Sequence, residues 1–168
     1  HQWLIGGWEN PTGRETGWEV PEGEVDVVID EAFTRWNVWR LYADPFWWEA
    51  TVSAWAGRYG DKRVIEWRTN RLTATSYAVR AFASAVKAGE ISHDGSADLA
   101  RHIGNAYRNI LNIRDDQSER LWTIQKERPD SPFKIDYAMA ALLSWEARND
   151  AIAAGASAEE EEAGVMFV

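Results

Sequence analysis

Apolar residues recur at helical spacing in five stretches of the chain. In the first stretch, Ile29, Ala32 and Trp36 fall on one stripe of an amphipathic helix. Pro45 precedes the second stretch and suits the first position of a helix. The pattern predicts helices over about residues 23–36, 46–57, 73–88, 96–107 and 133–154.

Short apolar runs between these helices indicate strands. Residues 2–9 and 17–20 would form a hairpin across Asn10–Gly13, where Asn opens the turn and Gly closes it. Further strands are expected at 38–43 and 63–67, with a short extended piece at 91–92 and a second hairpin from 110–113 and 121–124. Strands that alternate with helices predict an α/β fold, here a mixed sheet with helices on both faces.

The length of 168 residues fits one domain, which we expect over residues 1–150. Residues 151–168 form a tail rich in Ala and Glu. The chain opens without Met, inside the apolar run Trp3–Ile5, so we expect a piece of a longer protein. No apolar run approaches the ~18 residues that a membrane span needs, so no membrane partner is expected.

The amino-acid composition excludes several classes of catalytic and binding site. The absence of Cys excludes thiolate metal sites and a cysteine nucleophile. The net charge of −9 argues weakly against nucleic-acid binding, but residues 58–71 hold five basic and two acidic side chains, and residues 101–134 hold seven and five. The motifs of P-loop ATPases, dinucleotide-binding domains, zinc proteases and serine hydrolases are absent from the sequence.

Two acidic residues are the first candidates for chemistry. Asp44 ends an expected strand and precedes Pro45, so it is either a helix cap or a group at the carboxyl edge of the sheet, where active residues gather. Asp136 lies in the first turn of the last helix, where an acid complements the helix dipole. Because Asp130 and Ser131 already offer caps there, Asp136 is more suggestive of function.

A third cluster begins at the run His93-Asp94-Gly95. It continues on the next helix, where Asp98, His102 and Asn105 share one face at i, i+4 and i+7. A solvated polar stripe and a functional face explain this pattern equally well.

These motifs together resemble the nuclease domain of the large terminase subunits of tailed phages, in particular those of actinobacteriophages. The resemblance rests on Tyr42-Ala43-Asp44-Pro45, on His93-Asp94-Gly95 with His102 and Asn105, and on Lys134-Ile135-Asp136-Tyr137-Ala138-Met139-Ala140. It covers residues 1–150 and includes His1–Glu9, which is similar to the family's second strand.

The resemblance implies a ribonuclease H-like fold that cuts double-stranded DNA during genome packaging. It implies that Asp44 and Asp136 hold two Mg²⁺ or Mn²⁺ ions, which hydrolyse a phosphodiester bond. Site neighbours would be His93, Asp94, His102, Asn105 and Lys134, and DNA backbone contacts would come from Arg108, Arg114, Arg120 and Lys126. The family also implies a portal protein and a small terminase subunit as partners, in the cytoplasm of the infected bacterium.

One feature departs from the family. Its first metal-binding acid lies on a first strand upstream of the stretch that resembles His1–Glu9, and Glu9, Glu24, Asp26 and Asp30 sit in the wrong elements to replace it. The family's ATPase domain is also missing from this sequence. We therefore expect the chain alone to bind metal weakly and to cut DNA poorly or not at all.

Three alternatives stay open. The first is that the chain is an inactive DNA- or portal-docking fragment, and the second is that it is another ribonuclease H-like enzyme, such as a transposase or resolvase. The third is a carbohydrate-binding module, which the 11 Trp residues suggest. Trp48 and Trp55, however, share a helical stripe with Val52, which fits core packing better than a sugar platform.

Overall fold

Helices and short strands alternate along the part of the chain that the computed structural model describes, residues 1–10 and 17–156. The turn expected at Asn10–Gly13 and most of the tail lie outside it. The elements in order are α1 (Glu22–Arg35), β1 (Leu41–Ala43), α2 (Glu49–Tyr59), β2 (Val64–Glu66), α3 (Leu72–Ala88), α4 (Ala97–Gly104), β3 (Tyr107–Arg114), β4 (Arg120–Gln125) and α5 (Asp136–Ala153). The expected α/β class is confirmed.

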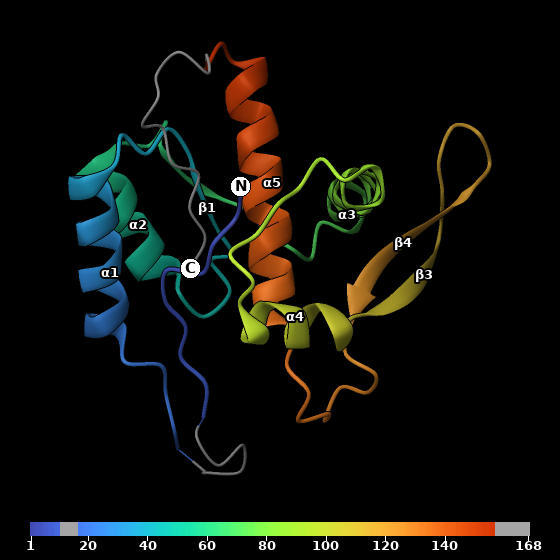
Figure 1. Ribbon diagram of the computed structural model, residues 1–168, viewed down its shortest axis with the longest axis horizontal. Helices are drawn as coiled ribbons and strands as arrows, with labels where there is room; N and C mark the ends of the chain where they lie inside the picture. Colours follow the sequence, from blue (N-terminus) through green and yellow to red (C-terminus); the bar gives the residue numbers. More distant parts are fainter. Residues whose placement is uncertain (11–16, 157–168) are drawn as a thin grey trace.

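The strands of the described residues form two small sheets, so the expected single mixed sheet is wrong. β1 pairs in parallel with β2, with Leu41 opposite Val64, and α2 connects them. β3 pairs only with β4 in an antiparallel hairpin that projects from the body (Figure 1). The ladder uses only the backbone groups that face the partner strand, so β3 and β4 are both edge strands.

α5 runs through the middle of the molecule, with α1 and α2 on one side of it and α3 on the other (Figure 1). On one side, Ile29 of α1, Leu41 of β1 and Val52 of α2 belong to one apolar cluster. On the other side, Val79 of α3 packs in a second cluster with Leu142 of α5. Burial of Leu142 against Val79, at roughly 25 cal/mol per Å² of apolar surface, holds α5 against α3.

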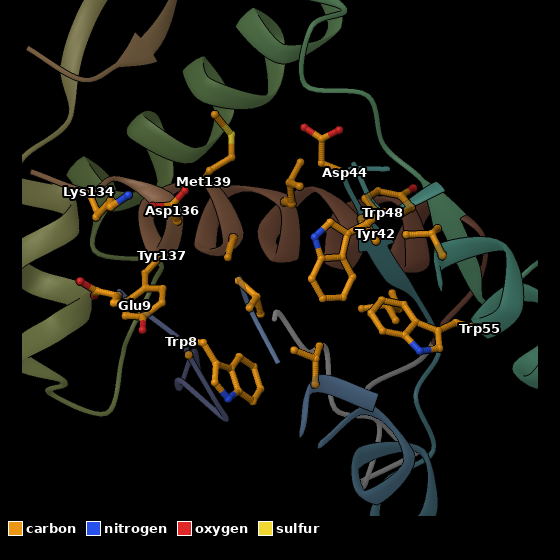
Figure 2. A pocket seen from close by; sticks show the side chains of 18 of the residues that line it. Trp8, Glu9, Tyr42, Asp44, Trp48, Trp55, Lys134, Asp136, Tyr137 and Met139 are labelled. Carbon is orange, nitrogen blue, oxygen red and sulfur yellow. The ribbon is translucent and has the colours of Figure 1, made fainter. Parts of the chain in front are cut away.

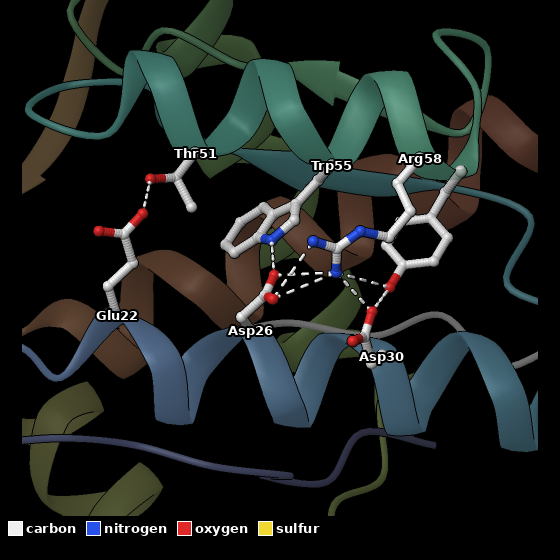
Figure 3. A network of polar contacts seen from close by, with 7 residues as sticks. Glu22, Asp26, Asp30, Thr51, Trp55 and Arg58 are labelled. Atoms are coloured by element: carbon white, nitrogen blue, oxygen red, sulfur yellow. Dashed lines mark hydrogen bonds and ion pairs between the residues drawn. The ribbon is translucent and has the colours of Figure 1, made fainter.

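A polar network on the surface joins α1 to α2 (Figure 3). Nη1 of Arg58 lies 2.6 Å from Asp30 and 3.1 Å from Asp26, and the indole N–H of Trp55 donates to Asp26 over 2.8 Å. These hydrogen bonds lower the pKa of Asp26, with the Trp55 bond the largest cause. The groups are partly exposed, so they orient the two helices more than they stabilise them.

The expected N-terminal hairpin is wrong. In the first segment only Gln2 forms a strand-like bridge, to His93, and residues 17–20 are not a strand. A strand exists only through a hydrogen-bonded neighbour, and among the described residues no strand pairs with residues 3–9. Gln2 is instead buried, and its side-chain amide donates to the Ala141 carbonyl and to Ser144, each over 2.8 Å.

Three expected helices have other ends, and one of them, α5, begins at Asp136 and not at Phe133. α2 begins at Glu49 and not at Phe46, because Trp47 adopts a φ of 68°, which a right-handed helix does not allow. α4 ends at Gly104, and Tyr107, expected in that helix, begins β3 opposite Gln125. The hydrogen-bond ladder of β3 and β4 thus includes a residue that the helical pattern assigned to the preceding helix.

The expected positions of α3 and of the second hairpin are confirmed, and local signals explain both. Gly89 ends α3 at a φ of 72°, and its N–H donates to the Ala85 and Val86 carbonyls. At the hairpin tip, one carboxylate oxygen of Asp115 accepts from the N–H groups of Gln117 and Glu119.

Among the described residues, no helix is both long and apolar enough to cross a membrane.

Candidate active site

A pocket of about 450 Å³ opens where β1 ends and α5 begins. Asp44, Lys134 and Asp136 all line it, although 92 residues separate the two acids. Figure 2 shows the two carboxylates at separate points of the wall, Asp136 at the start of α5 and Asp44 farther along. The fold therefore brings these three expected site residues into one pocket without direct contact between the acids.

Asp44 is half-buried directly after β1 and is held at both carboxylate oxygens. Oδ1 accepts from the N–H of Phe46 over 3.2 Å, which closes a turn around Pro45. Oδ2 accepts from the hydroxyl of Thr69, in the loop between β2 and α3. Asp44 thus acts as a turn-forming residue as well as part of the pocket wall.

Asp136 is the first residue of α5 and is exposed. Within the described residues it has no hydrogen bond or ion pair, so its carboxylate is available to a ligand. The backbone next to it is fixed, because the side-chain amide of Asn105 donates to the Lys134 carbonyl over 2.9 Å. Asn105 is therefore a positioning residue, which holds the loop before α5 against the end of α4.

His102 is fully buried and caps the start of α5. Its Nδ1 accepts from the N–H of Tyr137 over 3.0 Å, so Nε2 carries the proton and donates to Glu9 over 2.9 Å. The imidazole also stacks on the ring of Tyr137 at 4.1 Å. With both ring nitrogens occupied, His102 acts as a structural cap in this arrangement and not as a metal ligand.

Glu9 joins the N-terminal segment to this cap and lines the pocket. Its Oε1 lies 2.7 Å from Arg101, whose hydrogen bond is the largest cause of the lowered pKa of Glu9. Hydrogen bonds to Glu9 and then to Asp98 raise the pKa of Arg101. The sequence offered no signal for this set, because Glu9 lies about 90 residues before its partners.

His93 and Asp94 lie outside the pocket wall. Nδ1 of His93 accepts from the N–H of Gly95, and Asp94 accepts from the N–H groups of Ser96 and Leu4, the latter over 3.3 Å. Both residues fold their own loop and fasten it to the N-terminal segment. They are not brought together with Asp44 and Asp136.

The expected DNA-contacting residues Arg108, Arg114, Arg120 and Lys126 lie on or beside the hairpin and outside the pocket wall. The three arginines are exposed, and Arg114 faces Arg120 across the two strands. The guanidinium of Arg108 covers the Trp122 ring at 4.5 Å, which orients its charge. The projecting hairpin therefore carries exposed arginines, together with three acids at its tip, Asp115, Asp116 and Glu119.

The residues present meet the needs of a divalent metal only in part. Carboxylate oxygens of Asp44 and Asp136 suit Mg²⁺ or Mn²⁺. Within residues 1–10 and 17–156, however, no group of three His, Asp or Glu side chains lies close enough together to hold an ion. Of the three acids on the pocket wall, Glu9 and Asp44 are already hydrogen-bonded, which leaves Asp136 as the one without such a bond among the described residues.

Comparison with known proteins gives phage relatives. Two proteins named Gene 13 protein, from Mycobacterium phage L5 and Mycobacterium phage D29, are each 32% identical to this chain over 146 residues. The alignment covers 82% of this chain and 24% of each relative, so the chain spans about a quarter of the length of the curated relatives it matches. No family model matches the chain, and no solved structure matches it.

Proposed function

We propose that this chain belongs to the metal-dependent endonuclease part of a phage DNA-packaging terminase large subunit. One observation carries the proposal: the two acids that the motifs single out line the same pocket. The phage origin of the relatives fits this function, although their name states no activity. Portal protein and small terminase subunit as partners, and the cytoplasm of the infected host as the place of action, are part of the proposal.

The proposed fold is ribonuclease H-like, with β1 and β2 as part of its central sheet. In this arrangement Asp44 stands at the carboxyl end of a strand and Asp136 at the amino end of a helix packed beside it. This is the edge where α/β proteins place reacting groups. Glu9 also lines the pocket, but Arg101 and His102 hold its carboxylate, so the proposal concerns Asp44 and Asp136.

Each residue has a distinct part in the proposed reaction. Two bound metal ions would supply an activated water and stabilise the leaving oxygen. Asp136 offers a carboxylate that has no hydrogen bond among the described residues, and Asp44 offers one that Phe46 and Thr69 hold in place. Lys134 brings a positive charge to the wall where a phosphate would lie. The exposed arginines of the hairpin would contact the DNA backbone without reading its sequence.

One observation favours a second function, an inactive DNA- or portal-docking module. Both carboxylate oxygens of Asp44 are already hydrogen-bonded, and the third acid of the pocket wall, Glu9, is held by Arg101 and His102. A docking module would retain DNA without metal and would not cut it.

The test is a Mn²⁺ titration of the 168-residue chain followed by NMR. A paramagnetic ion broadens amide signals near it, so an ion held by both acids broadens the signals around residues 44 and 136 at the same concentration. Asp44→Asn and Asp136→Asn should each abolish this broadening. Asp61→Asn is the matched control, because Asp61 is an exposed acid outside the pocket.

Supercoiled plasmid provides the functional readout in the same buffer. We expect weak metal binding and slow nicking by the chain, lost in Asp44→Asn and Asp136→Asn and retained in Asp61→Asn. Absence of broadening at both acids, or nicking that survives both substitutions, would contradict the nuclease proposal. DNA retention in EDTA with no nicking by any variant would favour the docking module.

A further inference from the structure

Two aromatic residues follow Pro45 and stand out from the surface. The side chain of Phe46 is 63% exposed and that of Trp47 is 84% exposed, and their rings meet edge to face at 5.0 Å. Trp47 also holds a φ of 68°, a left-handed conformation that is unfavourable for a bulky residue. Neither the exposure nor the backbone conformation stabilises the fold, which directs attention to a ligand.

The aromatic pair belongs to the same turn as Asp44. The N–H of Phe46 donates to Oδ1 of Asp44, so a shift of the pair would move the carboxylate. The other oxygen of Asp44 accepts from Thr69, which fixes the loop between β2 and α3 beside this turn. The rings and the loop are therefore joined through Asp44 at one edge of the pocket, where Asp44 itself lines the wall.

The loop brings positive charge to this edge. Arg68 and Arg71 flank Thr69, and both are exposed. Arg68 pairs with Glu66 at 2.9 Å, whereas Arg71 has no ion pair among the described residues. A ligand that fits here offers negative charge to the arginines and a flat ring to the aromatics. A nucleic acid with an accessible base meets both conditions.

We propose that Phe46 and Trp47 form a stacking platform for an unpaired base of DNA beside Asp44. The proposal rests on the proposed function in taking DNA as the ligand, and it specifies distorted or frayed DNA as the preferred form. Stacking of one base on an aromatic side chain predicts a preference of about tenfold for DNA that presents such a base. The platform would hold one strand so that its phosphate lies near the carboxylate.

The experiment compares three labelled duplexes by fluorescence anisotropy, with the whole chain in EDTA. One duplex is fully paired, one has a single unpaired base, and one has an abasic residue at that place. The variants are Trp47→Gly, which removes the ring and suits the left-handed backbone, and Phe46→Ala. Tyr77→Ala is the control, because Tyr77 is a 48% exposed aromatic residue on α3 in a different groove.

We expect the wild-type chain and Tyr77→Ala to bind the unpaired-base duplex about tenfold more tightly than the abasic duplex. Trp47→Gly should lose this preference and keep its affinity for the paired duplex, and Phe46→Ala should reduce the preference. Equal wild-type affinity for the two duplexes, a preference that survives Trp47→Gly, or uniform weakening on all three would overturn the proposal. So would absence of DNA binding.

Because EDTA removes metal, failure of the nuclease proposal leaves this measurement intact. Conversely, metal-dependent nicking without a base preference would overturn the platform alone.

Discussion

Replacement of His102 by Phe would test the cap at the start of α5. Phe keeps a flat ring that can stack on Tyr137 at the observed 4.1 Å, but it offers neither an acceptor nor a donor. The change therefore removes two hydrogen bonds, from the Tyr137 N–H and to Glu9, from a fully buried position. It isolates the polar part of the cluster from its packing.

The expected loss of stability is about 2 kcal/mol. A lost cap on a helix N–H costs about 1 kcal/mol. The bond to the charged carboxylate contributes about another 1 kcal/mol, at the low end for such bonds, because Glu9 is 31% exposed and keeps its partner Arg101. For a chain of 168 residues this corresponds to a fall in Tm of about 6 °C.

Urea unfolding followed by far-UV circular dichroism measures the total, and hydrogen exchange of the Tyr137 amide measures the cap itself. A double-mutant cycle with Glu9→Gln should give a coupling of about 1 kcal/mol. If His102→Phe stays within about 0.5 kcal/mol of the wild type and the Tyr137 amide remains protected, the assigned hydrogen-bonding role of His102 is wrong.

Three further predictions concern other positions. Gly7→Ala should destabilise the chain by about 1–3 kcal/mol in urea, because a Cβ there would lie 2.7 Å from a ring carbon of Tyr137 and nearer still to its hydroxyl; Gly23→Ala, which meets open space, is the control. Burial first, and then the charge of Asp150, raise the pKa of Glu146, so its ionised form opposes folding. Glu146→Gln should therefore stabilise the chain at neutral pH, as measured by urea titration. This gain should disappear as the pH falls through the raised pKa to below 4.5, where Glu146 is protonated in both the folded and the unfolded state. Trp47→Gly should raise the unfolding free energy by up to about 1 kcal/mol, and Trp47→Ala should not, because only Gly adopts the observed φ of 68° at little cost.

The parts of the fold that the sequence predicted have local causes. α3 ends at a glycine, and the second hairpin turns around an aspartate whose side chain satisfies the turn, so short segments carried the information. The prediction of a strand over residues 2–9 was wrong because a strand depends on a neighbour elsewhere in the chain. The predicted start of α2 was wrong because nothing in the sequence indicates that Trp47 adopts a left-handed conformation.

The residues of the candidate site also fall into those that local sequence signals pointed to and those that depend on distant partners. Asp44 and Asp136 drew attention by their places at the ends of elements, and the fold puts them in one pocket; their binding of metal stays a prediction. The polar face that includes His102 and Asn105 was open to two interpretations, and the described contacts of both residues are structural. Glu9 and Thr69 were missed because their roles come only from partners distant in the sequence.

The cap of α5 also has a consequence for the order of folding. It joins segments from three distant parts of the chain, since Glu9 lies 93 residues from His102, and Gln2 lies 139 residues from the carbonyl of Ala141. Contacts between such distant residues form slowly, because large loops must close before the contacts repay the entropy. During synthesis, α1 and α2 can already meet while α5 is still in the ribosome. The pocket edge at Asp136 is therefore complete only when segments about 90 to 140 residues apart have met.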